Sequence, residues 1–193
     1  HRWDPVHKVE HQFTLYKERV KADRDELSNH ERWPCLSNHI TQEMIRRMMM
    51  NPTRQRADYR PIFYSLADEP GIGGQAAASD FCFSPDCRRE FRTWLQQRYP
   101  SLEALNAQWD ASFTQWNEVV GLTTDQTFAR PGDNFSPWCD HTEFMDDVLM
   151  NAYRIGVETV RQFDPGAFSA IGGAQGPMAV GGWDYYKLSQ VFE

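Results

Sequence analysis

The segment 61–70, with the sequence PIFYSLADEP, joins an apolar run of strand length to two adjacent carboxylates, Asp68 and Glu69. The apolar part suits a buried strand, whereas Asp and Glu are rarely buried without a partner. Barrel enzymes carry catalytic groups at the C-terminal ends of buried strands. We therefore predict that Glu69 is a catalytic carboxylate. The alternative is a polar turn that only closes the strand.

Composition narrows the class of protein. The chain has 193 residues, of which 40% are hydrophobic, which is enough to bury a core and is typical of a single domain. A net charge of −7 argues against a nucleic-acid partner. No apolar run approaches membrane-spanning length, so no membrane partner is expected. Four cysteines are too few for a disulfide scaffold in a chain of this length, and they leave the compartment open.

Two apolar runs predict strands, one ending at Asp68-Glu69 and one over residues 167–172. Helical spacing predicts a helix over residues 6–20 and another over 40–50, capped by Ser37 or Asn38 and ended by Asn51-Pro52. Further helices are expected from 85 to 98, from 102 to 109, from 140 to 163 and from 183 onward. Asp140 and Glu143 resemble a capping box that opens the longest of these helices.

This order of elements predicts an α/β fold. Two strands joined by a long helical crossover should pair in parallel. Their continuous apolar runs indicate strands covered on both faces. A closed (β/α)₈ barrel takes about 250 residues, so this chain is expected to supply part of one, as a piece of a longer protein.

Several segments resemble glycoside hydrolase family 42, the β-galactosidase type. They are FYSLADE (63–69), FCFSPDCRREFRTWL (81–95) and YPSLEALNAQW (99–109), and weaker similarity continues over 144–163 and 183–186. The resemblance covers roughly residues 35–193. It implies that residues 1–193 are a fragment of one catalytic TIM barrel, with a helical insertion after the strand that ends at Glu69.

The resemblance also implies a chemistry. In that family the Glu that ends the fourth strand is the general acid/base of a retaining glycosidase, and Glu69 matches it. The preceding residue is usually Asn and is here Asp68, which weakens any inference of β-galactosidase specificity. Retaining enzymes use two carboxyl groups about 5–5.5 Å apart. The nucleophile is expected beyond Glu193.

Many family members carry zinc on a Cys-x-Cys-x-x-Cys run with a fourth Cys upstream. Cys82 and Cys87 match the ends of the run and Cys35 matches the upstream ligand, but Ser84 stands in the middle position. Structural zinc takes four ligands, usually thiolate or imidazole. The sequence therefore predicts that no cofactor is required. A structural zinc completed by Asp86 or a distant His is the alternative, and Cys139 is expected to be structural.

Three further residues are candidate substrate contacts. Asp68 adjoins the catalytic candidate, Arg32 lies near the tip of a presumed earlier strand, and Trp183 stands at a loop-to-helix junction where it could stack on a sugar. Solvation of Arg32 and packing of Trp183 are the alternatives.

The sequence thus predicts part of a retaining glycosidase that hydrolyses β-galactosides or related glycosides. The alternatives are a homologue that binds carbohydrate without cleaving it and a small zinc- or partner-binding module. A carbohydrate substrate is the expected partner. The sequence leaves open whether the full-length protein forms a homo-oligomer.

Overall fold

The computed structural model describes residues 9–68, 71–72, 80–173 and 184–192. Glu69 and Trp183 therefore lie outside the described residues. The helices are α1 (Val9–Ala22), α2 (His39–Arg56), α3 (Pro85–Arg98), α4 (Leu102–Trp109), α5 (Thr124–Ala129), α6 (Ser136–Phe163) and α7 (Tyr185–Phe192), the short 3₁₀ turns are η1 (Leu27–His30), η2 (Ala57–Tyr59) and η3 (Trp116–Glu118), and the strands are β1 (Phe63–Asp68) and β2 (Phe168–Gly172). None of the described helices combines the length and apolarity that crossing a bilayer requires.

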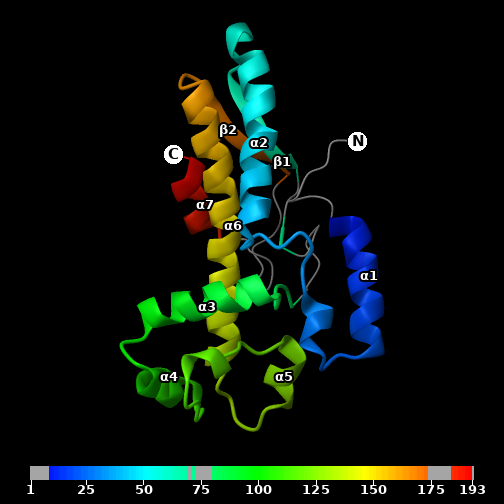
Figure 1. Ribbon diagram of the computed structural model, residues 1–193, viewed down its shortest axis with the longest axis vertical. Helices are drawn as coiled ribbons and strands as arrows, with labels where there is room; N and C mark the ends of the chain where they lie inside the picture. The colour runs from blue at the N-terminus through cyan, green and yellow to red at the C-terminus, as the bar shows by residue number, and fades with distance from the viewer. Residues whose placement is uncertain (1–8, 69–70, 73–79, 174–183, 193) are drawn as a thin grey trace.

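Two long helices form the axis of the molecule. Helices α2 and α6 run side by side, and the two strands lie against them (Figure 1). Helices α3, α4 and α5 gather around the N-terminal half of α6, so they form a helical lobe at the end remote from the strands (Figure 1). The order of strand, several helices, strand and helix is the predicted one.

The two strands pair in parallel, as the sequence predicts. Phe63 pairs with Phe168 at the start of the strands, and Asp68 pairs with Gly172 at their C-terminal ends. The register shifts by one residue between Ser65 and Ala67. Both predicted strands are correct to within two residues, because each is a short apolar run bounded by polar or turn residues.

The expectation that both strands are covered on two faces is wrong for the described part of the chain. Tyr64 and Ala67 are buried, but the paired rings of Phe63 and Phe168 are 57% and 71% exposed. Tyr64 packs with Val160 of α6 and donates a hydrogen bond to Asp164 at 2.9 Å. The helices thus cover the side of the sheet that carries Tyr64, while the rings of Phe63 and Phe168 are largely exposed.

Asn38 begins α2 as predicted, since its side chain accepts hydrogen bonds from the amides of Ile40 and Thr41. The predicted end at Asn51-Pro52 is wrong, because α2 continues through Pro52 to Arg56. A proline inside a helix forfeits one backbone hydrogen bond. The long packed boundary with α6 and the burial of Thr53, whose hydroxyl donates to the carbonyl of Met49 at 2.7 Å, compensate for that loss.

The predicted start of α6 at Asp140 is also wrong. The helix begins at Ser136, whose amide donates to Asn134 Oδ1 at 3.0 Å, and Pro137 stands in its first turn. Asp140 instead lies in the interior of the helix, with its carboxylate buried in the helical lobe. Asp140 therefore has the spacing of a capping box with Glu143, but its carboxylate makes contacts with other helices.

Candidate active-site edge and cysteine cluster

The C-terminal ends of β1 and β2 form one edge, where Asp68 and Gly172 are register partners. The Asp68 carboxylate extends over β2, because a Cβ placed on Gly172 would lie 2.9 Å from Asp68 Oδ1. Only a residue without a side chain leaves that space to the carboxylate. Glu69 follows Asp68 directly in the chain, and its own placement lies outside the described residues.

Arg32 is buried, with 2% of its surface exposed. Its Nε donates to the carbonyl of Ile72 at 2.9 Å, and its Nη1 donates to the carbonyl of Pro34. Ile72 is itself fully buried and lies three residues beyond Glu69. Arg32 therefore ties the loop that follows β1 to the segment that leads into Cys35. These contacts are those of a positioning residue, and a direct contact with substrate stays a prediction.

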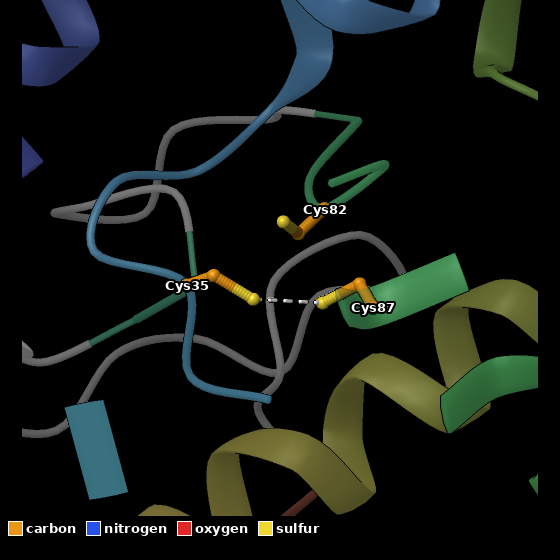
Figure 2. Close-up of side chains that lie close together, drawn as sticks. All are labelled: Cys35, Cys82 and Cys87. Carbon is orange, nitrogen blue, oxygen red and sulfur yellow. Dashed lines mark hydrogen bonds between the residues drawn. The ribbon is translucent and has the colours of Figure 1, made fainter. Parts of the chain in front are cut away.

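Cys35, Cys82 and Cys87 are brought together from two distant segments. All three are buried, and their Sγ atoms lie within 4.8 Å of one another. Figure 2 shows the thiols of Cys35 and Cys87 pointing toward each other and Cys82 above them, with Cys35 on the loop before α2, Cys82 on the segment before α3 and Cys87 in the first turn of α3. The Sγ atoms of Cys35 and Cys87 are 3.5 Å apart. Cys139 is exposed and lies outside this cluster.

Two serine hydroxyls, those of Ser84 and Ser37, lie within hydrogen-bonding distance of the thiols. Ser84 Oγ donates to Cys35 Sγ at 3.1 Å and accepts a hydrogen bond from the amide of Cys87 at 3.3 Å. Ser37 Oγ lies 3.2 Å from Cys87 Sγ. Ser84 is the N-cap of α3, so one hydroxyl both caps the helix and contacts the cluster.

Burial and hydrogen bonding shift the pKa values of the three thiols in different directions. Hydrogen bonds from Cys82, Cys87 and Ser84 lower the pKa of Cys35, because they stabilise its thiolate. Burial raises the pKa of Cys82, and hydrogen bonding with Cys35 and Cys82 raises that of Cys87. The hydrogen bonds around Cys35 therefore favour the thiolate form more at this residue than at Cys82 or Cys87.

The structure also shows a buried hub that the sequence analysis missed. Asp140 Oδ2 accepts hydrogen bonds from Tyr99 Oη at 2.6 Å and Trp109 Nε1 at 2.7 Å, while its Oδ1 lies 3.1 Å from Arg98 Nε. Burial and the adjacent carboxylate raise the pKa of Tyr99 to about 12. The hub joins α3, α4 and α6, and it is a structural centre of the helical lobe.

A second missed residue, His141, lies beneath the cysteine cluster. Its ring stacks on Phe83 with centroids 4.3 Å apart, and its Nε2 lies 3.4 Å from the carbonyl oxygen of Cys82. Burial lowers the pKa of His141 to about 4, so the ring is neutral at neutral pH. The sequence alone did not indicate that His141 is buried here, because its contacts are with Phe83 and Cys82, which lie about 60 positions earlier in the chain.

The family profile described as Beta-galactosidase (Glyco_hydro_42) matches residues 31–193. The chain belongs to glycoside hydrolase family 42. Its relatives in that family include the β-galactosidase LacZ of Heyndrickxia coagulans, 29% identical over 89 residues, and BgaA of a Thermus species, 35% identical over 92 residues. These alignments cover 44% and 45% of this chain and 13% and 14% of the relatives. The chain thus matches a small part of each relative's length.

Two solved structures of β-galactosidases share the fold. The enzyme from Halorubrum lacusprofundi superposes with a TM-score of 0.64 at 20% identity, over 82% of this chain and 23% of that one. The enzyme from Marinomonas ef1 superposes with a TM-score of 0.63 at 16% identity, over 91% of this chain and 28% of that one. The profile match confirms the predicted family. The two structures show that the fold of this chain is that of a section of a β-galactosidase.

Proposed function

We propose that this chain is a section of the (β/α)₈ barrel of a retaining glycosidase that acts on β-galactosides or related glycosides. In this proposal Glu69 is the general acid/base, the nucleophile lies on a strand beyond Glu193, and α3–α6 form an insertion after the strand that ends at Glu69. The supporting observation is the edge where Asp68 and Gly172 pair, because it puts the C-terminal ends of two parallel strands side by side immediately before Glu69.

The proposed mechanism follows from the position of Glu69 in the chain. A carboxylic acid at the end of a barrel strand can protonate the departing glycosidic oxygen, and the resulting carboxylate can then deprotonate the attacking water. A second carboxylate must attack the anomeric carbon, since one group cannot do both at once. The 193 residues alone are therefore expected to hydrolyse nothing, and the activity belongs to the full-length protein.

The test compares Glu69→Gln with the unaltered full-length protein on two aryl β-galactosides, one with an acidic phenol as leaving group and one with a weakly acidic phenol. A weakly acidic phenol needs its proton more, so Glu69→Gln should reduce kcat/KM by about 10²–10⁴-fold for that substrate and by less for the other. Equal losses on both substrates would contradict the acid role of Glu69. Turnover by the isolated 193 residues, lost in Glu69→Gln, would contradict the need for a nucleophile beyond Glu193.

A second candidate function is carbohydrate binding without hydrolysis, and Asp68 favours it. The family resemblance implies a neutral Asn at this position, whereas Asp68 places a carboxylate, exposed and extended toward Gly172, beside Glu69. Binding of galactosides with no turnover by the full-length protein would support this function. Turnover that appears only in Asp68→Asn would show that the extra charge is the cause. A homo-oligomer of the full-length protein stays part of the proposal.

A further inference from the structure

The cysteine cluster offers three sulfur ligands with a geometry close to that of a zinc site. Four thiolates about 2.3 Å from a tetrahedral ion lie about 3.8 Å from one another. The separation of 3.5 Å between Cys35 and Cys87, and the 4.8 Å limit over all three sulfurs, are compatible with three corners of such a tetrahedron. The question is therefore what stands at the fourth corner.

In the Cys-x-Cys-x-x-Cys pattern of the family resemblance, the remaining ligand would stand at Ser84, the middle position of the run from Cys82 to Cys87. A serine hydroxyl is not among the usual ligands of zinc, which are thiolate, imidazole and carboxylate. Its proton is directed to Cys35 Sγ, and its oxygen accepts the amide of Cys87 as the cap of α3. Ser84 is also buried, so its position is not open to a solvent ligand.

No other side chain within the described ranges supplies the missing ligand. The cluster of ligating types contains Cys35, Cys82 and Cys87 alone among the residues that the structure places. Asp86, the nearest carboxylate in the sequence, is committed elsewhere: one oxygen accepts from Asn38 Nδ2 at 2.6 Å and the other lies 2.8 Å from Arg89 Nη1. The donor set therefore does not fit structural zinc.

The same contacts show what holds the cluster together instead. Ser84 binds Cys35, Ser37 binds Cys87, and the backbone amide of Arg32 donates to Cys82 Sγ at 3.3 Å. These bonds join the loop before α2 to the start of α3, which is the link that a metal ion would otherwise provide. Each of the three sulfur atoms therefore has a hydrogen-bond partner within the described part of the protein.

We infer that this cluster is a metal-free, hydrogen-bonded junction, in which the hydroxyl of Ser84 takes the place of a fourth metal ligand. The inference concerns the structure of the section and is independent of the proposed glycosidase activity. A protein that hydrolyses no sugar could still carry this junction, and an active enzyme could still prove to hold zinc here.

The experiment measures zinc in the full-length protein, produced with zinc in the medium, for the unaltered protein and for Ser84→Cys, Ser84→Ala and Cys35→Ser. The unaltered protein should hold no more zinc than Cys35→Ser, within about a tenth of an equivalent, whereas Ser84→Cys should gain about one equivalent because it completes four thiolates. Ser84→Ala should gain none. Zinc that the unaltered protein holds and Cys35→Ser loses would overturn the inference.

Thermal unfolding gives a second measurement on the same proteins. A strong chelator should leave the Tm of the unaltered protein in place and should lower that of Ser84→Cys, since a ligand of the native state raises Tm only where it binds. Ser84→Ala should melt at a lower temperature than the unaltered protein with or without the chelator, because it loses the α3 cap and the bond to Cys35. A Ser84→Cys protein that folds but binds no zinc would also overturn the inference. If that variant does not fold, the zinc content of the unaltered protein still decides.

Discussion

Arg32 gives the sharpest test of how the strand edge is positioned. Replacing it by Met keeps an unbranched chain of similar length and removes two charge-assisted hydrogen bonds, to the carbonyls of Ile72 and Pro34. Both acceptors belong to buried residues, so their carbonyl groups would lose a partner in a region with little access to water. At about 1.5–3 kcal/mol for each bond to a charged donor, the free energy of unfolding should fall by about 3–6 kcal/mol.

The assay is urea unfolding of the full-length protein, followed by kinetics on an aryl β-galactoside. Arg32→Lys keeps the positive charge but has its donors on a single nitrogen, which replaces one of the two hydrogen bonds. It should therefore lose about half as much stability as Arg32→Met. The matched control is Arg46→Met, because Arg46 is exposed and pairs with Glu43 on the surface of α2. That pair should contribute less than about 1 kcal/mol.

Kinetics separate the two roles considered for Arg32. A positioning residue holds the backbone at Ile72, three residues after Glu69 in the chain, so its loss should lower kcat, and KM should change little. A residue that only binds substrate should raise KM and leave the unfolding free energy unchanged. A stability loss below about 1 kcal/mol, together with a KM raised tenfold or more, would refute the assignment that the contacts with Ile72 and Pro34 support.

Three other predictions concern the helical lobe and the cluster. Asp140→Ala should lower the free energy of unfolding by about 3–5 kcal/mol, because it leaves Trp109 Nε1 and Tyr99 Oη without their acceptor. The control is Asp133→Ala, at an exposed position nearby, which should lower the free energy of unfolding by less than about 0.5 kcal/mol. Gly121→Ala should lower it by about 2 kcal/mol, since the added Cβ would lie 2.7 Å from His141 Cβ; an unchanged urea midpoint would show that the ring yields. The pKa of His141 is about 4 in the folded protein and about 6.5 in the unfolded chain, so the unfolded state binds more protons between these two pH values. The free energy of unfolding should therefore fall by about 3 kcal/mol as the pH drops from 6.5 to 4. The variant His141→Phe should lack this pH-dependent component.

The elements that local sequence specifies were predicted well. Asn38, Ser84 and Ser101 each cap a helix, and each stands directly before a helix that the sequence indicates. The strands were found because their apolar runs are short and bounded. Family membership was predicted as well, since the matching segments are contiguous stretches of chain.

The errors have a common cause in contacts between distant parts of the chain. Pro52 ends a helix in local terms, but packing against α6 carries α2 through it. Asp140 has the spacing of a cap, yet its carboxylate is used by Tyr99 and Trp109 across the lobe. By contrast, the meeting of Cys35 with Cys87, 52 residues away, was anticipated, because the family resemblance placed both in one candidate ligand set.

The two departures from the family pattern differ in their consequences. At Ser84 the lost ligand is replaced locally: the hydroxyl bonds to Cys35 and to the amide of Cys87, so the section keeps its fold with the substitution in place. Asp68 is different, because it is exposed at the strand edge, where it adds a carboxylate directly before Glu69 in the chain. Hydrolysis and binding without turnover therefore differ in what they require of Asp68, and they make the same demand of Ser84. That choice depends on whether the carboxylate of Asp68 is compatible with a sugar held against Glu69.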